Sequence, residues 1–157
     1  CHPAIPAESQ VALALRTLCG FSIEEIAKAF LTNKETINKR LYRAKEKIRS
    51  ENLQMHMPSS TELNGRLESV LQTIYLLFNE GYYSSSQEVI VRKELCLEAM
   101  RLCLLLVNHK MTNLPYVNAL MAIMCFHVSR FESRLVNGEV LSWHEQNRSL
   151  WDKDLIN

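Results

Sequence analysis

The sequence predicts an all-α fold, in which an N-terminal three-helix domain with a helix-turn-helix is followed by a helical bundle or repeat-like domain. Three observations predict it. Ser or Thr followed three residues later by Glu, the signature of a capping box, precedes apolar runs at Ser22, Thr32 and Ser59. These runs place apolar residues three and four apart, as one face of a helix does. The strongest β signal is Asn137-Gly138, which predicts one small hairpin.

The first helix is expected over residues 7–18. Pro3 and Pro6 form an irregular lead-in, and Cys19-Gly20 ends the helix because glycine commonly follows a helix C-terminus. The apolar face of this helix would cover the two helices that come next.

Residues 22–49 are typical of two helices joined by a turn of about three residues. Leu31 lies in the turn. A short helix, a tight turn and a basic second helix are the outline of a helix-turn-helix DNA reader. The apolar stripes that would face inward are Ile26, Ala27 and Phe30 in the first helix and Ile37, Leu41, Ala44 and Ile48 in the second.

Positive charge is concentrated in the second of these helices. The whole chain has a net charge of only +1, but residues 34–49 hold seven of its 18 Lys and Arg residues beside two Glu. A local basic footprint of this kind is what a groove-binding helix needs.

We expect four residues to face the groove and read bases, because they lie largely opposite the apolar stripe. Arg or Lys can bond guanine O6 and N7, and Asn can bond adenine N6 and N7. Phosphate contacts fix the register without reading sequence. The expected base-reading set is Asn38, Lys39, Tyr42 and Arg43, and the expected phosphate-binding set is Lys34, Thr36, Arg40, Lys45 and Lys47. The competing interpretation is a solvated basic face on an ordinary helix.

A polar segment with Pro58 marks a boundary. We expect residues 1–50 to form the DNA-binding domain, 51–59 a linker and 60–157 a helical extension. The chain starts without Met and stops inside a helical pattern, so it is expected to be a fragment of a longer protein.

The extension is expected to hold helices from Ser59 to about Asn79 and over residues 87–107, 115–133 and 147–156, with a loop at 79–86. The second and third of these contain stretches that are apolar nearly all round, which predicts central burial. Helix pairs of about 35–40 residues would suit a tetratricopeptide-like stack.

No motif indicates catalysis, so we expect no enzyme activity, no catalytic residue, no metal and no cofactor. His127 is interpreted as a core histidine. Cys96, Cys103 and Cys125 are interpreted as reduced, buried residues of a cytoplasmic protein. No signal peptide and no transmembrane run are found, so no membrane partner is expected.

Two stretches carry a family resemblance. Glu24-Glu25-Ile26-Ala27 and the run from Thr36 to Lys45, which fits T-[IV]-x-x-R-[LI]-x-R-A-[RK], resemble region four of bacterial RNA polymerase sigma factors of the extracytoplasmic-function type. Leu31 departs from that family, in which most members have Gly in the turn, so the resemblance implies that this Leu must avoid or tolerate a positive φ. The remainder, especially residues 74–82, is similar to the tetratricopeptide-like, regulatory C-terminal extension of one sigma subgroup.

The resemblance implies specific partners. Region four binds the −35 promoter element in the major groove and docks on the flap of the polymerase β subunit. Region two, which reads and melts the −10 element, would lie before Cys1, so this chain is expected to recognise promoter DNA without opening it. The extension is expected to contact region two or a regulatory partner.

Two other functions fit the same order of elements. One is a one-component helix-turn-helix regulator with a C-terminal helical domain for ligand binding or dimerisation. The other is a helical adaptor that acts mainly through residues 60–157.

Overall fold

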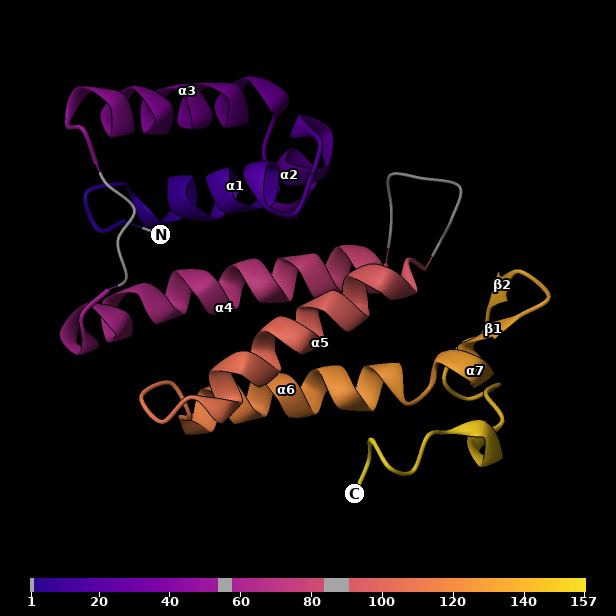
Figure 1. Cartoon of the computed structure of the whole chain (residues 1–157). Helices are drawn as coiled ribbons and strands as arrows, with labels where there is room; N and C mark the ends of the chain where they lie inside the picture. Colours follow the sequence, from indigo (N-terminus) through magenta and orange to yellow (C-terminus); the bar gives the residue numbers. More distant parts are fainter. Residues whose placement is uncertain (1, 54–57, 84–90) are drawn as a thin grey trace.

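A computed structural model describes residues 2–53, 58–83 and 91–157 of the chain (Figure 1). Almost all of its elements are helices, which confirms the predicted all-α class. The helices follow one another as layers, with α3 outermost, then α1 with α2, then α4, α5 and α6 (Figure 1). In chain order the elements are α1 (Ala7–Thr17), α2 (Ile23–Ala29), α3 (Lys34–Ser50), α4 (Ser60–Tyr82), α5 (Lys93–Asn108), α6 (Pro115–Val128), α7 (Phe131–Arg134), β1 (Leu135–Val136), β2 (Glu139–Val140) and the 3-10 helix η1 (Arg148–Leu150).

The first three helices enclose a shared apolar core. Val11 of α1, Ile26 of α2 and Ile37 of α3 are fully buried. The capping box predicted at Ser22 is present, since Glu25 N–H donates to Ser22 Oγ at 3.1 Å and Ser22 N–H donates to Glu25 Oε2 at 2.6 Å. These two hydrogen bonds between residues close in sequence therefore fix the start of α2 where the sequence predicts it.

The capping box predicted at Thr32 is wrong, because Asn33 caps α3 instead. Asn33 Oδ1 accepts a hydrogen bond from Thr36 N–H at 2.8 Å. The turn is one residue longer than expected. Within it Leu31 adopts a φ of 49°, and the Thr32 N–H donates to Ala27 O at 2.9 Å. Leu31 thus tolerates the left-handed conformation, and its side chain is 95% exposed.

α4 continues past its expected end to Tyr82, into residues that were predicted to form a loop. Ring contacts within α4 and from α7 support this last turn. The Tyr82 ring stacks on Phe78 at 5.8 Å and on Phe131 at 5.7 Å between ring centroids. Gly81 lets α4 approach the start of α5, and Arg92 N–H donates to Gly81 O at 2.7 Å. The rest of the predicted loop and the expected first residues of the next helix, residues 84–90, lie outside the described residues. Val91 and Arg92 are not helical, so the described part of this helix, α5, begins later than predicted, at Lys93.

The apolar helices α5 and α6 are not buried all round, so the prediction of central burial is wrong. Leu105 in α5 is 56% exposed and Phe126 in α6 is 52% exposed. The reason is the stacked arrangement, in which α5 packs against α4 on one side and α6 on the other (Figure 1). α6 also ends earlier than predicted, at Val128, and a turn separates it from the short α7.

The predicted hairpin is confirmed, whereas the predicted last helix is wrong. β1 and β2 pair antiparallel around Asn137 and Gly138, whose φ values of 53° and 83° suit a type I′ turn. Only η1 forms within residues 147–156. A longer helix is not formed because Asp152 N–H donates to Ser129 O at 2.9 Å instead of to the preceding turn.

The three-helix unit packs directly on the extension, mainly through α1 against α4 (Figure 1). One apolar cluster runs through both parts, from Val11 through Leu77 to Met124. Glu25 in α2 also forms an ion pair with Arg92, at 3.5 Å. A shared core therefore connects the helix-turn-helix to the helices behind it.

Cys96 and Cys103 are buried free thiols, as predicted, and Cys125 is half-buried. Burial raises the pKa of Cys96 to about 12 and that of Cys103 to about 11. Among the described helices, none combines the length and the hydropathy that crossing a bilayer requires.

Candidate nucleic-acid interface

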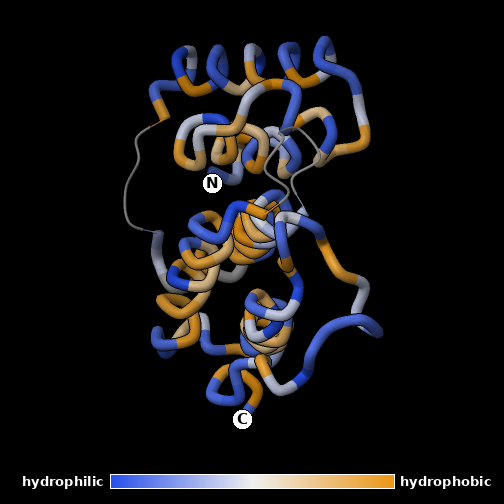
Figure 2. The backbone as a smooth tube through the Cα atoms, turned by 90° about the vertical axis from the view of Figure 1, so that its right-hand side faces the viewer, coloured by the Kyte–Doolittle hydropathy of each residue, from blue (hydrophilic) through white to orange (hydrophobic). Residues whose placement is uncertain are grey.

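α3 forms one end of the molecule and presents one side away from the other helices (Figure 1). Ile37, Leu41 and Ala44 are buried on its inner side, where it packs against α1 and α2. Figure 2, coloured by hydropathy, shows hydrophilic residues along the outer side of this helix. The apolar stripe predicted from the sequence therefore orients the helix as expected.

All four predicted base-reading residues are exposed on α3. Asn38 and Lys39 lie one turn before Tyr42 and Arg43, so the four side chains occupy neighbouring turns. Tyr42 is 67% exposed, and Arg43 forms no ion pair with any described residue. Lys39 is less free, because its Nζ lies 2.6 Å from Glu35 Oε1.

Three of the predicted phosphate-binding lysines lie at the sides of this face. Lys34 Nζ is 2.7 Å from Glu24 Oε2, and Lys47 Nζ is 3.7 Å from Glu51 Oε1. Lys45 has no ion-pair partner within residues 2–53, 58–83 and 91–157. Surface ion pairs contribute at most about 1 kcal/mol, so a phosphate can take the place of either carboxylate.

Arg40 and Thr36, the other two predicted phosphate-binding residues, are partly engaged within the fold. Arg40 Nη2 lies 2.6 Å from Glu8 Oε2, and its guanidinium lies 5.6 Å from the centre of the Phe30 ring. Arg40 thus connects α3 to α1 and to the residue that ends α2. Thr36 is half-buried and gives its backbone N–H to the Asn33 cap. Both remain at the edge of the outer face.

Further charged residues share the outer face and were not among the predicted site residues. Arg49 Nη1 donates to Glu46 Oε1 at 2.7 Å. Arg49 follows Tyr42 by seven residues, which is nearly two helical turns, so helical spacing alone could have placed it on this face. Glu35 and Glu46 reduce the positive charge of the face. Each can also accept a hydrogen bond from cytosine N4.

The residues outside α3 that could carry chemistry contact other parts of the fold. His127 is half-buried, with its Nδ1 2.8 Å from Arg130 Nη2 and its ring 4.6 Å from that of Tyr82. Burial, together with the Arg130 and Arg134 guanidiniums, lowers the pKa of His127. In the polar segment after the hairpin, Arg148 lies over the Trp143 ring at 4.9 Å. Across the described part of the chain, no group of three His, Cys, Asp or Glu side chains could hold a metal ion.

Two family models match the chain. Residues 1–48 match the model for sigma-70, region 4, a range that covers α1, α2 and nearly all of α3. This match confirms the predicted resemblance to sigma-70 region 4 and supports a sigma-like, promoter-binding function for these helices. Residues 66–157 match a second model, described as a family of unknown function (DUF6596).

A curated relative has a similar sequence over nearly the whole of this chain. The uncharacterized protein R00370 of Rhizobium meliloti (strain 1021) is 36% identical over 156 residues, which is 99% of this chain. The chain spans only 37% of the length of that relative. No solved structure matches the chain. Since the second model covers more than half of the sequence, the chain belongs to the family of unknown function DUF6596, here preceded by a segment that matches the model for sigma-70, region 4.

Proposed function

We propose that this chain is part of a sigma factor of the extracytoplasmic-function type, in which α1 to α3 read the −35 promoter element. The observation that carries the proposal is the exposed, basic outer face of α3 within the segment that matches sigma-70 region 4. The protein would act in the cytoplasm in transcription initiation, without enzymatic activity of its own. The helices after α3 would form a tetratricopeptide-like regulatory extension.

Base reading is assigned to the centre of α3. Arg43 is free of ion pairs with the described residues, so its guanidinium can bond guanine O6 and N7 without first giving up a partner. Lys39 can do the same once it leaves Glu35, which costs little because that pair is exposed. Asn38 would bond adenine, and Tyr42 would contact the adjoining base or sugar.

Anchoring to phosphates is assigned to the sides of the helix. Lys45 is free, while Lys34 and Lys47 would exchange a carboxylate for a phosphate. Thr36 would offer its hydroxyl. Arg40 can keep Glu8 on one nitrogen and donate to a phosphate from another, because a guanidinium has five N–H donors. These contacts would fix the register of α3 in the major groove.

The proposed protein partners are the flap of the RNA polymerase β subunit, a region two outside this chain and a regulatory partner of the extension. Region two would open the DNA after the −35 element is bound. The resemblance to sigma factors implies this division, in which region four binds the −35 element and region two melts the −10 element.

The proposal is tested by selecting bound sequences from random duplex DNA with the full chain at low salt, where phosphate contacts are strongest. Enrichment of one short motif, together with a binding constant that falls steeply with salt, is expected. Recovery of an unenriched pool would contradict base reading. Failure to bind any duplex at low salt would favour the helical adaptor.

One observation favours a second candidate, a ligand-controlled one-component regulator. An apolar groove of about 560 Å³ lies where α1 meets α4 and α5, between Leu18, Leu77 and Leu105. A small molecule there would contact the DNA-reading unit and the extension at once. Gel filtration and binding to a polymerase flap peptide separate the two functions. An obligate two-fold dimer supports the regulator, and flap binding supports the sigma factor.

A further inference from the structure

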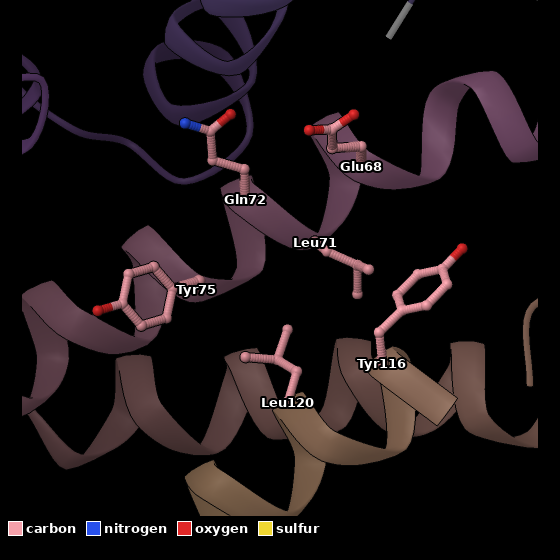
Figure 3. A pocket seen from close by; sticks show the side chains of 6 residues that line it. All are labelled: Glu68, Leu71, Gln72, Tyr75, Tyr116 and Leu120. Atoms are coloured by element: carbon pink, nitrogen blue, oxygen red, sulfur yellow. The ribbon is translucent and has the colours of Figure 1, made fainter. Parts of the chain in front are cut away.

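A second surface, away from the DNA-binding face, has the features of a peptide-binding site. It is a groove of about 670 Å³ between α4 and α6 (Figure 3). Figure 3 shows Leu71 and Leu120 facing each other across it, with Tyr116 rising from α6 beside them. The lining residues are Glu68, Leu71, Gln72, Tyr75, Tyr116 and Leu120.

The groove combines an apolar floor with exposed aromatic walls. Leu71 and Leu120 are half-buried, whereas Tyr75 is 49% and Tyr116 is 52% exposed. Tyrosine gives a large contact area and a polar tip at little cost in conformational entropy, and it is enriched at protein interfaces. Four of the six lining residues are exposed. The groove is therefore open to solvent, which suits a chain segment better than an enclosed small molecule.

The charge of the groove is negative. Glu68 is exposed and forms no ion pair with any described residue, so its carboxylate is free to accept a cation. The basic residue of α4, Arg66, is already bound to Glu62 at 2.9 Å, and α6 contains no Lys, Arg, Asp or Glu. α3, in contrast, has seven basic residues against two Glu. Nucleic acid is therefore directed to α3 and away from the groove.

We propose that this groove binds a basic segment of a separate protein, in which an Arg or Lys stands beside aliphatic side chains. The aliphatic groups would pack on Leu71 and Leu120. The cation would pair with Glu68 and lie against the ring of Tyr116, which adds a cation–π attraction. Gln72, with donors and an acceptor, would bond the backbone of the segment. This inference does not depend on which DNA sequence α3 reads.

The test uses the full chain and three probe peptides that differ only in their charged positions. The first is Gly-Ser-Leu-Arg-Leu-Arg-Leu-Ser-Gly, and Glu or Gln replaces both Arg in the others. Amide chemical shifts are followed by NMR during titration. The Arg peptide is expected to move the signals of residues 68–75 and 116–120, with much smaller changes for the other two peptides. Equal binding of the Glu or Gln peptide, or shifts centred elsewhere, would overturn the proposal.

Two matched variants test the assigned carboxylate. Glu68→Gln keeps the shape of an exposed side chain and is expected to weaken the Arg peptide about two- to five-fold, as loss of an exposed ion pair does. Glu139→Gln removes an exposed carboxylate on β2 and should leave the affinity unchanged. Thermal unfolding of both variants checks that the fold is intact. Unaltered affinity in Glu68→Gln would show that Glu68 does not hold the cation.

Discussion

Gly65 and Gly81 lie in the same helix, α4, yet alanine is expected to have opposite effects at the two positions. A Cβ added at Gly65 would meet no atom within 4 Å. A Cβ added at Gly81 would lie 2.8 Å from Cys96 Sγ, 2.9 Å from Cys96 N and 2.9 Å from Arg92 O. Two of these three atoms belong to the backbone, so a change of rotamer cannot relieve the overlap. α5 would have to move away from α4.

The size of each effect follows from two opposing contributions. Alanine is favoured over glycine inside a helix by about 0.5–1 kcal/mol. At Gly65 this contribution acts alone, so Gly65→Ala is expected to raise the free energy of unfolding by that amount. At Gly81 it is opposed by overpacking, which costs about 1–3 kcal/mol. Gly81→Ala is therefore expected to lower the free energy of unfolding by about 1–2 kcal/mol.

Urea unfolding followed by circular dichroism measures both variants, with Gly65→Ala as the matched control for helix propensity. The expected result is a higher midpoint for Gly65→Ala and a lower midpoint for Gly81→Ala than for the unchanged chain. If Gly81→Ala is as stable as Gly65→Ala, α5 does not approach α4 as closely as described, and the account of why α4 extends to Tyr82 is wrong.

Leu31→Gly is expected to raise the free energy of unfolding by about 0.5 kcal/mol, because glycine relieves the left-handed strain and the leucine side chain is exposed; urea unfolding measures it. Arg134→Ala is expected to lower the free energy of unfolding by at least about 2 kcal/mol. Arg134 is buried, donates to Tyr82 O at 2.8 Å and stacks on the Tyr82 ring. Hydrogen bonds from the Ser59 N–H and hydroxyl lower the pKa of Glu62 from 4.5 to about 2. A lowered carboxyl pKa stabilises the fold above the unfolded value, so this contribution is lost as the pH falls from 4.5 towards 2. An NMR titration of Ser59→Ala should show a Glu62 pKa closer to 4.5.

Local chemistry made some of the fold predictable. The cap at Ser22 and the hairpin at Asn137-Gly138 depend on residues that are neighbours in the sequence, and both are confirmed. The end of α4 depends on Phe131 and on the close approach of α5, which are remote in sequence from Tyr82. The exposure of Leu105 likewise depends on how the helices stack. Such features require the tertiary arrangement.

The candidate site likewise has features that the sequence predicts and features that depend on how the helices pack. The apolar stripe that starts at Ile37 was enough to predict which side of α3 faces outward. Helical spacing could also have placed Arg49 there. The contact between Arg40 and Glu8 could not be predicted, because it joins two helices whose packing is not visible in the pattern of either one. The cap at Asn33 was missed since it depends on the backbone of the turn at Leu31.

The central claim is that α3 reads a DNA sequence through Arg43 and anchors through its flanking lysines. The most direct test measures the affinity of Arg43→Ala and Lys47→Ala for the selected duplex and for a scrambled duplex at one salt concentration. Arg43→Ala is expected to lose about 1–3 kcal/mol on the selected duplex and much less on the scrambled one, whereas Lys47→Ala should weaken both by the same factor. Equal losses on the two duplexes for Arg43→Ala would contradict the claim.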